Sequence, residues 1–528
     1  MCGIAGILGE GASEEVLRSL LKPIHHRGDP EFYCEIACGK GYAIGTNRLG
    51  IVDPENGRQP FSRNGVFAIQ NGEIYNVPEL MGQLFPNERL ATACDTEFLA
   101  VAYSRLGHAF IPQLEGMYAC AFVDPSRNHW CLARDPLGIK PLYLARRGEL
   151  YYFASECKAL TQALVDLDSI RCLQPGEIIV CGTTLQYRMP FRFGTEAATD
   201  AESLDTVSQA LRKSVKMCLP KSGTVACLLS GGIDSSTILW LAQELNEGRV
   251  EAFTFSASDT GSSEDFLAAK LVCDHLRVPL TVVTPSVDDL CDYYLEHGVS
   301  MTETFESALV RNATSYHFLC REVRNRGYKF CLSGEGADEV FGGYDYLNKL
   351  DENGREQAIR NSLEEIHRTY LQMVDRASMA ATVEVRVPYM NWQFVNEAIK
   401  LPASTRIRGT QNKWSLRGIS DGCLPNQIRF RRKLGMNPGA GHGSNDPSDG
   451  IYARATRRFY ADQEKLASDA MLCSHFAEEY SLNLADEEEI FNFSRFVASG
   501  YQKLAGVASR PQLNTSFLSS NERLEALR

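Results

Sequence analysis

The stretch that decides the fold of the second half of the chain reads Thr224-Val225-Ala226-Cys227-Leu228-Leu229-Ser230-Gly231-Gly232-Ile233-Asp234-Ser235-Ser236. Its apolar beginning predicts a strand that is buried on both faces. Glycines and serines then form a turn, and a helical pattern follows over residues 235–245. Glycines let the backbone approach an anion, and the free N–H groups and dipole of a helix start favour negative charge. The stretch therefore predicts a phosphate-binding loop between a buried strand and a helix.

Strands and helices alternate after this loop. Strand patterns lie at residues 250–255, 280–283 and 329–332, and a helical pattern lies at 264–276. This alternation is typical of a doubly wound parallel sheet, which binds ligands at the carboxyl ends of its strands. From about residue 362 the pattern is mostly helical, up to a polar end at residues 509–528.

The first part of the chain is dominated by short strands instead. Apolar runs bounded by turn residues predict strands at residues 41–46, 66–70, 117–122 and 130–133. Helical patterns lie at about 14–21, 77–84 and 96–106. This arrangement predicts packed antiparallel sheets with flanking helices. The small, polar segment 193–200 is the candidate linker, so we expect two domains, at residues 1–192 and 201–528.

Length and charge exclude several classes of protein. The 528 residues carry 54 Lys+Arg against 66 Asp+Glu, a formal net charge of −12. An acidic balance argues against a protein that coats nucleic acid. No apolar run reaches the roughly 18–20 residues that span a bilayer, and the apolar N-terminus lacks the basic region of a secretory signal. We expect a cytoplasmic protein whose 17 cysteines are reduced.

One cysteine differs from the others by its position. Cys2 becomes the first residue when Met1 is removed. Its α-amine, with a pKa of about 7.7–8.0, is then close enough to take the proton of a thiol whose pKa is about 8.5. A nucleophile and its base on one residue are typical of N-terminal-nucleophile catalysis.

Six ordered segments extend this hypothesis. They read Cys2-Gly3-Ile4-Ala5-Gly6, Asn47-Arg48-Leu49-Gly50-Ile51-Val52-Asp53, Asn71-Gly72-Glu73-Ile74-Tyr75-Asn76, Cys94-Asp95-Thr96-Glu97, Arg134-Asp135-Pro136-Leu137-Gly138-Ile139-Lys140-Pro141-Leu142-Tyr143 and Phe153-Ala154-Ser155-Glu156. In this order they resemble the class II glutamine amidotransferases, over nearly the whole N-terminal domain. The resemblance implies an α+β N-terminal-nucleophile sandwich with αββα layers.

The resemblance also implies the roles of individual residues. Cys2 would attack the glutamine amide and form a γ-glutamyl thioester. The Asn71 side chain and the Gly72 N–H would stabilise the oxyanion. Arg48 would bind the glutamine carboxylate and Asp95 its ammonium group. The remaining implied glutamine contacts are Leu49, Ile51, Val52 and Glu73.

The second half resembles a known group of enzymes as well. Residues 230–236 resemble the pyrophosphate-binding loop (PP-loop) of enzymes that split ATP into AMP and pyrophosphate, and they lack the Gly-Lys-Ser/Thr ending of a Walker A loop. Residues 332–344 resemble the second signature of the asparagine synthetases, and residues 374–388, interpreted as helical, complete the match. Over residues 1 to about 440 the chain is thus similar to the glutamine-hydrolysing, B-type asparagine synthetases.

This second resemblance implies an α/β, adenine-nucleotide-α-hydrolase-like domain that uses ATP and Mg²⁺. Asp234 and Asp338 would hold Mg²⁺, a hard cation that prefers carboxylate oxygens. Glu335 would handle the proton of the attacking ammonia. Lys433 would neutralise phosphate charge. The implied ATP contacts are Leu228, Ser230, Gly231, Gly232, Asp234, Ser235, Ser236, Phe255, Ser333 and Gly334, and the implied acceptor contacts are Arg311, Glu335 and Asp338.

Together the two resemblances imply an ATP-dependent amide synthetase. Glutamine would be hydrolysed at Cys2, and ammonia would cross an interdomain tunnel to a carboxylate that ATP has adenylated. Aspartate is the expected acceptor. The implied partners are these small molecules, with no nucleic acid and no membrane, and a homodimer is left open.

Three segments depart from the family pattern. Arg27-Gly28-Asp29-Pro30 stands where the family usually reads Arg-Gly-Pro-Asp, and proline constrains itself and the residue before it, so we expect a reshaped loop near the glutamine site. Ala308 and Leu309 stand where the family has two threonines, in the segment 303–311 that ends at Arg311. The turn at 435–439 also differs from the family's usual Phe-Ser-Asp-Gly.

The last two departures lie on the acceptor side and leave two alternatives open. One is a related enzyme of a specialised pathway that amidates a different carboxylate or uses a different nitrogen nucleophile. The other is a glutaminase-only or regulatory homologue. Loss of Asp234, Asp338, Glu335 or Lys433 would favour this second alternative, and all four residues are present.

Overall fold

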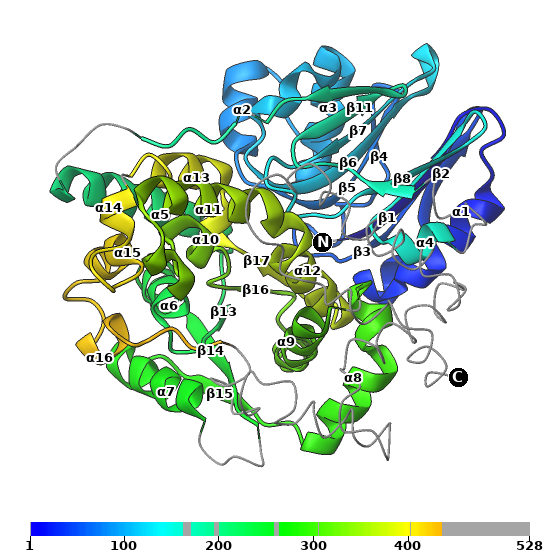
Figure 1. The fold of residues 1–528 in the computed structure, drawn as a ribbon. Helices are drawn as coiled ribbons and strands as arrows, with labels where there is room; N and C mark the ends of the chain where they lie inside the picture. The colour runs from blue at the N-terminus through cyan, green and yellow to red at the C-terminus, as the bar shows by residue number, and fades with distance from the viewer. Residues whose placement is uncertain are drawn as a thin grey trace, which may run out of the picture.

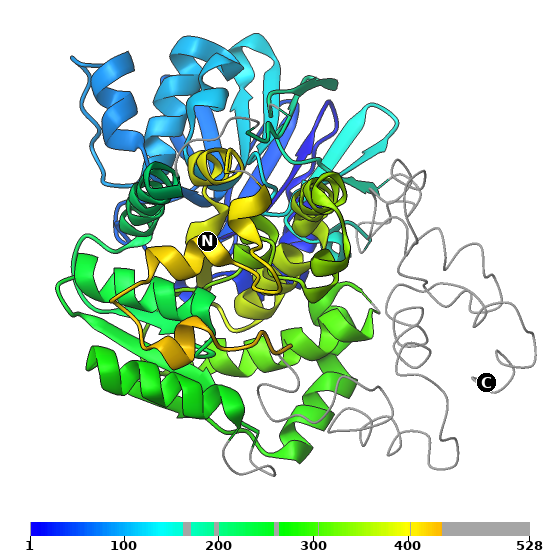
Figure 2. The same cartoon turned by 60° about the vertical axis from the view of Figure 1, so that its left-hand side comes forward.

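The computed structural model describes residues 2–161, 170–188, 190–194, 200–257, 263–304, 306–401 and 403–435. The centre of the expected linker (195–199), most of the divergent turn (436–439) and the polar end (509–528) lie outside the described residues. A domain of two sheets lies against a domain built on a third sheet (Figure 1, Figure 2). Within the described ranges no helix has the length and apolar character needed to cross a membrane.

The described part of the N-terminal domain contains twelve strands. They are β1 (Cys2–Leu8), β2 (Glu35–Gly39), β3 (Tyr42–Arg48), β4 (Phe61–Arg63), β5 (Val66–Ile74), β6 (Gly116–Asp124), β7 (His129–Arg134), β8 (Tyr143–Arg147), β9 (Leu150–Ala154), β10 (Ile170–Cys172), β11 (Glu177–Val180) and β12 (Thr183–Gln186). They form two six-stranded antiparallel sheets, ordered β10-β8-β9-β1-β3-β2 and β12-β11-β7-β6-β5-β4.

Alternating side chains pack these sheets into layers. Ile4 of β1 points into a core shared with Ile69 of β5, while Ile7 packs on the other face against Leu20. Helices α1 (Glu14–Leu21) and α4 (Cys157–Thr161) cover the outer face of the first sheet, and α2 (Val77–Leu84) and α3 (Asp95–Leu106) cover the second (Figure 1). The predicted αββα sandwich is confirmed.

The predicted strand at 66–70 is too short, because β5 continues to Ile74. Residues 71–73 are polar or glycine, so they do not continue an apolar run, yet they pair with β6 through Asn71–Ala119, Gly72–Tyr118 and Glu73–Met117. The first residues, for which no strand was expected, form β1 in the interior of the first sheet. These two strands carry Cys2 and Asn71.

The C-terminal domain is built on a five-stranded parallel sheet ordered β15-β14-β13-β16-β17. Its strands are β13 (Val225–Leu228), β14 (Val250–Phe255), β15 (Leu280–Val283), β16 (Phe330–Leu332) and β17 (Glu384–Arg386). Its helices are α5 (Asp200–Cys218), α6 (Ile233–Leu245), α7 (Glu264–Leu276), α8 (Val287–Thr302), α9 (Ser307–Asn325), α10 (Ala337–Phe341), α11 (Glu352–Glu365), α12 (Tyr370–Ala380), α13 (Trp392–Ala398), α14 (Ala403–Arg406), α15 (Trp414–Ile419) and α16 (Asn426–Arg429).

The predicted parallel sheet is confirmed, with one correction. We interpreted residues 374–388 as helical throughout, and this was wrong, because Glu384–Arg386 forms β17 at the sheet edge and pairs with β16. Val383, Val385 and Val387 alternate with charged residues, which is the period-two pattern of a strand. The order of the strands reverses between β13 and β16, and ligand sites of such sheets form at this switch point.

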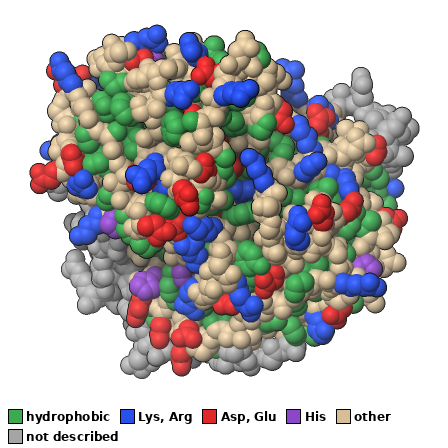
Figure 3. Space-filling model, turned by 180° about the vertical axis from the view of Figure 1, so that it is seen from behind, with side chains coloured by type: hydrophobic (Ala, Val, Ile, Leu, Met, Phe, Trp, Pro, Cys, Tyr) green, Lys and Arg blue, Asp and Glu red, His purple; other side chains and the backbone are tan. Residues whose placement is uncertain are grey.

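Acidic side chains do not gather into one patch on the face of the molecule that Figure 3 shows. On this face Lys and Arg side chains lie among Asp and Glu side chains over both domains.

Candidate active sites

A cavity of about 360 Å³ opens at the switch point between β13 and β16. The loops that follow these two strands both contribute to its wall. Of the residues predicted for ATP, acceptor and Mg²⁺, those that line it are Leu228, Ser230, Gly232, Asp234, Ser235, Phe255, Ser333, Gly334, Glu335, Asp338 and Lys433.

Three predicted residues are not part of this wall. Gly231 has φ +71°, and a Cβ there would lie 2.4 Å from the Ala269 nitrogen, so this glycine serves the packing of the loop on α7. Ser236 is fully buried within α6. Arg311 precedes the wall residue Tyr316 by five residues of α9, which places the two side chains about 140° apart around the helix axis. Ala308 and Leu309 are also absent from the wall.

Two lysines neutralise the carboxylates of the cavity. Lys413 Nζ lies 2.5 Å from Asp234 Oδ2 and 2.6 Å from Asp338 Oδ1, and Lys433 Nζ contacts Asp338 Oδ2. Burial would raise the pKa of Asp338, but the two ammonium groups outweigh it and hold that pKa well below its usual range. Burial would lower the pKa of Lys433, but Asp338 and Asp234 raise it instead. Asp338 and Lys433 are therefore charged at neutral pH.

The sequence did not predict Lys413 as a site residue, because a single lysine in a loop has no distinguishing pattern. Its side chain is 3% exposed, and its backbone has φ +58°, which is uncommon for a residue with a Cβ.

The ion pair between Lys413 and Asp338 explains why Gly343 of the 332–344 signature is a glycine. A Cβ at Gly343 would lie 1.8 Å from Asp338 Oδ1 and 2.3 Å from Lys413 Cε, so only glycine leaves room for this ion pair.

The same carboxylates fit a divalent cation that also binds phosphate. Asp234 Oδ1 is buried and has no hydrogen-bond partner among the described residues, so it is available as a ligand. Within those residues no group of three His, Cys, Asp or Glu side chains is placed to hold a metal ion by itself. A cation held by Asp234 and Asp338 would therefore need phosphate oxygens to complete its coordination.

The other candidate site surrounds Cys2 at the beginning of β1. Cys2 is 4% exposed, and its backbone N–H donates to Asn71 Oδ1 at 3.2 Å. The Asn71 Nδ2 group is buried and has no acceptor within the described part of the chain, so it remains available as a donor beside the thiol. Gly72 follows with φ +144°, and a Cβ there would lie 1.9 Å from the Met117 carbonyl oxygen. Burial raises the pKa of the Cys2 thiol, so the thiol needs a base to become a nucleophile.

Arg48 lies opposite Cys2 in the β1–β3 pairing. Its Nε donates to Glu35 Oε2 at 3.1 Å, and its guanidinium lies 3.9 Å from the centre of the Phe32 ring. Its side chain is almost fully buried. A substrate carboxylate that binds Arg48 must therefore share this guanidinium with Glu35.

Two acidic residues complete this site. Asp95 begins α3 and accepts a hydrogen bond from the Ile74 nitrogen at 2.8 Å. Burial raises the pKa of Asp95, and burial together with Asp95 raises the pKa of Glu73 to about 8. Glu73 also pairs with Arg386 of the other domain at 3.4 Å. An ammonium group bound between these two carboxyl groups would lower both pKa values and so favour their ionised forms.

The remaining predicted glutamine contacts lie at the domain boundary. Leu49 packs against Met379 of α12, and the half-buried Ile51 joins this small cluster. Val52 is half-buried in the same loop. The loop at 48–52 thus has one side on the candidate site around Cys2 and the other on the second domain.

The transposed Asp29-Pro30 pair fixes the loop at 48–52 to the second domain. Pro30 requires an extended residue before it, and Asp29 has φ −74° and ψ 141°. The Asp29 carboxylate accepts from Arg324 Nη2 at 2.5 Å, from Lys329 Nζ at 2.8 Å and from the Gly50 nitrogen at 3.1 Å. Asp29 therefore connects the loop at 48–52 with α9 and with the residue that precedes β16.

We expect Asp29→Asn to lower the free energy of unfolding by about 2 kcal/mol, because an amide accepts less strongly from charged donors. Burial would raise the pKa of Asp29, but Lys329 and Arg324 lower it below 3.8. A lowered pKa stabilises the folded state above the unfolded pKa, and this contribution is lost as the pH falls through the folded pKa. The difference between wild type and variant should therefore shrink only below about pH 4.

Denaturant unfolding at several pH values measures this difference. Glu31→Gln removes one negative charge from an exposed neighbour and should leave the unfolding curve unchanged. Equal curves for wild type and Asp29→Asn at pH 7 would contradict the stabilising role of Asp29.

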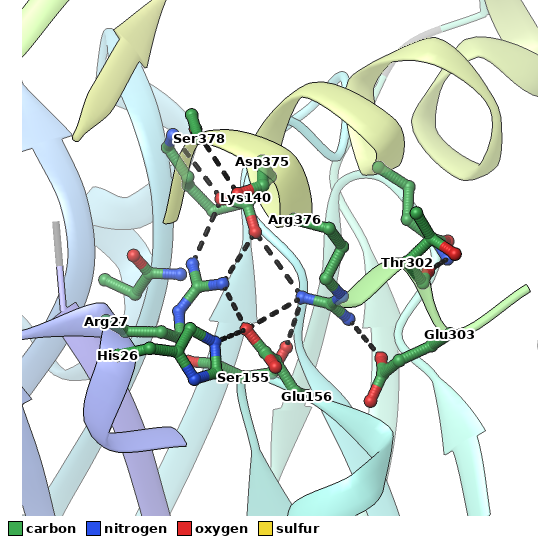
Figure 4. A network of polar contacts seen from close by, with 12 residues as sticks. His26, Arg27, Lys140, Ser155, Glu156, Thr302, Glu303, Asp375, Arg376 and Ser378 are labelled. Carbon is green, nitrogen blue, oxygen red and sulfur yellow. Dashed lines mark hydrogen bonds and ion pairs between the residues drawn. The ribbon is translucent and has the colours of Figure 1, made fainter. Parts of the chain in front are cut away.

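A buried charge network joins the two domains behind Cys2 (Figure 4). Arg27 donates to Glu156 at 2.7 Å, to both Asp375 oxygens at 2.9 and 3.0 Å, and to the Cys2 carbonyl at 3.3 Å. Burial would raise the pKa of Asp375, but Arg27 and Lys140 lower it, so the Asp375 carboxylate is ionised at neutral pH. Arg27 and Asp375 are 348 residues apart in the chain, which is why sequence reasoning did not pair them.

Glu303 belongs to this network. It lies in the segment that was expected on the acceptor side, but its carboxylate pairs with Arg376 at 2.6 Å and accepts from the Lys158 nitrogen at 2.8 Å. Both side chains of the Glu303–Arg376 pair are fully buried at the domain interface. The beginning of the segment 303–311 thus holds the domains together.

Comparisons with known proteins agree with this architecture. A model of the glutamine amidotransferase domain matches residues 1–174, and a model of asparagine synthase matches residues 206–364 and 351–487. Asparagine synthetase [glutamine-hydrolyzing] 3 of Arabidopsis thaliana is 31% identical over 470 residues, which cover 84% of this chain and 79% of that protein. Asparagine synthetase B of Escherichia coli (strain K12) is 30% identical over 473 residues, with 84% and 83% covered. The chain therefore belongs to the family of glutamine-hydrolysing asparagine synthetases.

Proposed function

We propose that this protein makes asparagine from aspartate, with glutamine as the nitrogen donor and ATP as the energy source. The observation that carries the proposal is the presence of two complete sites in one chain. Cys2 lies beside Asn71, whose Nδ2 group has no acceptor among the described residues, and the Asp234–Asp338 pair lies with two lysines at the switch point of the parallel sheet. Buried ion pairs between Arg27 and Asp375 and between Arg376 and Glu156 hold the two domains together.

In the first site the Cys2 thiolate attacks the amide carbon of glutamine. Once Met1 is removed, the α-amine of Cys2 accepts the thiol proton. Asn71 Nδ2 and the Gly72 N–H donate to the oxyanion of the tetrahedral intermediate. As the C–N bond of this intermediate breaks, the leaving nitrogen takes the proton held by the α-amine and departs as ammonia, and the γ-glutamyl thioester remains on Cys2. Water then hydrolyses the thioester to glutamate and frees the thiol. Arg48 binds the substrate carboxylate, and Asp95 and Glu73 bind its ammonium group. The loop that carries Leu49, Ile51 and Val52 forms the rest of the pocket.

In the second site the loop at 230–236 binds the phosphates of ATP, and Lys413 and Lys433 neutralise their charge. The aspartate β-carboxylate attacks the α-phosphorus, the bond to the bridging oxygen breaks, and pyrophosphate leaves. Ammonia then attacks the acyl carbon of the aspartyl adenylate and AMP leaves, while Glu335 takes the proton that the nitrogen loses.

Asp234 and Asp338 would hold Mg²⁺ in this site. When bound, Mg²⁺ supplies charge neutralisation at the triphosphate and the departing pyrophosphate. Lys413, which bridges these two carboxylates, would share them with the cation.

Several further features belong to the same proposal. Ammonia passes through the domain interface from Cys2 to Glu335, and the domains comprise residues 1–192 and 201–528. The protein acts in the cytoplasm and assembles as a homodimer. Light scattering at micromolar concentration tests the assembly.

Pyrophosphate release with ATP, Mg²⁺ and glutamine, measured across a panel of carboxylates, tests the function. We expect release with aspartate and a matching amount of asparagine. Turnover on another acid but not on aspartate would replace the proposal with a specialised amidotransferase. Glutamine hydrolysis without pyrophosphate release on any acid would leave a glutaminase-only homologue.

A further inference from the structure

Tyr316 is a wall residue of the ATP cavity that no motif identified. It lies in the middle of α9, and its side chain is 4% exposed. Its hydroxyl oxygen is 2.6 Å from Ser333 Oγ and 3.3 Å from Glu335 Oε1. Ser333 Oγ in turn accepts a hydrogen bond from the Glu335 nitrogen at 3.3 Å.

The direction of these hydrogen bonds follows from the number of protons. An ionised carboxylate only accepts, so the single phenolic proton of Tyr316 goes to Glu335. Between the two hydroxyls, Ser333 must then be the donor and Tyr316 the acceptor. The bonds form a closed ring, from the Glu335 N–H to Ser333 Oγ, from Ser333 to Tyr316, and from Tyr316 back to the Glu335 carboxylate.

We propose that Tyr316 is a positioning residue that holds the Glu335 carboxylate in place for the capture of ammonia. The closed set of three hydrogen bonds fixes the carboxylate relative to the backbone of Glu335 itself. It is anchored outside the loop, because α9 packs against α8, α12 and the strands β14 and β15. This role rests on the proposed function, in which Glu335 takes the proton of the attacking nitrogen.

The charges around Glu335 show why such a restraint matters. Lys433 attracts the carboxylate, whereas Asp338 and Asp234 repel it. These forces would draw an unrestrained Glu335 toward Lys433, which serves the phosphates. The hydrogen bond from the hydroxyl of the buried Tyr316 has a fixed direction. The attraction of the flexible Lys433 ammonium group has no such direction. Tyr316 thus keeps Glu335 separate from the phosphate-binding groups.

Tyr316→Phe removes the hydroxyl and keeps the buried ring. Two reactions of the full-length variant are measured. The first is ATP–pyrophosphate exchange with aspartate, and the second is asparagine formation from ammonium chloride. We expect exchange within about twofold of wild type and a kcat for asparagine formation that is about 10–100-fold lower, with unchanged KM for ATP and aspartate. The expected loss is part of the roughly 10²–10⁴-fold that general acid–base catalysis supplies.

Two further variants sharpen this test. Tyr293→Phe is the matched control, since its ring stacks on His317 of α9 and its hydroxyl contacts only Met301 Sδ, at 3.7 Å, among the described residues. It should leave both reactions unchanged. Ser333→Ala removes the hydroxyl that bonds to Tyr316 and to the Glu335 nitrogen. This variant should also slow asparagine formation more than exchange. Glutamine hydrolysis by each preparation shows that the protein is folded.

Three results would overturn the role of Tyr316. The first is a Tyr316→Phe variant that forms asparagine as fast as wild type. The second is an equal loss of exchange and asparagine formation, which would mean that the hydroxyl serves ATP binding or packing. The third is a wild-type enzyme without exchange on aspartate, which would overturn the proposed function as well and is thus distinguishable from the first two.

Discussion

Cys2→Ala is expected to abolish glutamine-dependent synthesis while ammonia-dependent synthesis continues within about twofold of wild type. The substitution removes the only group proposed to attack the glutamine amide, so the glutaminase rate should fall at least about 10³-fold. Cys2 is separated from the ATP cavity by the domain interface, and the switch-point residues do not contact it. Mass spectrometry of the asparagine formed from glutamine or from ammonium chloride measures both reactions.

Cys131→Ala is a suitable control for this variant. Cys131 is fully buried in β7, away from the Asn71 amide, so its loss removes a core thiol without removing the nucleophile. Both reactions should continue in this control. Loss of both reactions in Cys2→Ala would contradict the two-site scheme. Intact mass must show that Met1 is absent, because a retained Met1 would leave Cys2 without its α-amine.

Asp338→Asn is expected to abolish synthesis with either nitrogen source and to leave glutamine hydrolysis unchanged. Asp338 lies between the ammonium groups of Lys413 and Lys433, and a neutral amide cannot compensate both charges. In the variant Lys433 loses its carboxylate partner, whereas Lys413 keeps its ion pair with Asp234. The variant also loses one of the two oxygen ligands proposed for Mg²⁺, so we expect synthesis to fall at least about 10³-fold.

ATP–pyrophosphate exchange over a range of Mg²⁺ concentrations tests this expectation. Asp345→Asn changes the same charge at the edge of the cavity, where Asp345 is exposed and lies 3.8 Å from Arg432. This control should remain within about threefold of wild type, as exposed ion pairs contribute about 0–1 kcal/mol. Ammonia-dependent synthesis at the wild-type rate in Asp338→Asn would rule out the proposed role of the carboxylate pair.

Much of this architecture is visible in short stretches of sequence. Helices α1, α2 and α7 occupy the predicted residues, since each has an amphipathic or capped pattern that local interactions determine. The phosphate-binding loop was predicted for the same reason, because strand, glycine turn and helix follow each other within thirteen residues. Most residues predicted for the ATP side do line one cavity.

Other features were not predictable, because they depend on pairing between distant strands. The polar end of β5 is a strand only because β6 lies beside it. The Val383–Val387 alternation was overlooked inside a segment with a helical pattern, and β16 gives it a partner. Lys413 and Tyr316 reach the cavity from a loop and a helix whose positions the sheet order determines.

The transposed Asp29-Pro30 pair shows the same division within one motif. Proline dictates an extended Asp29 from the sequence alone. That Asp29 meets Arg324 and Lys329, about 300 residues away, follows only from the packing of the two domains.

The sequence by itself determined the order of the two domains, the strand, glycine turn and helix of the stretch that begins at residue 224, and the position of the proposed nucleophile at residue 2. These features arise from interactions between residues that are close in the chain. Tertiary structure alone decided which charges are paired, which glycines are indispensable and which hydroxyl holds Glu335. Such contacts depend on distances of a few ångströms between elements that are far apart in sequence, and only the packed sheets and helices set those distances.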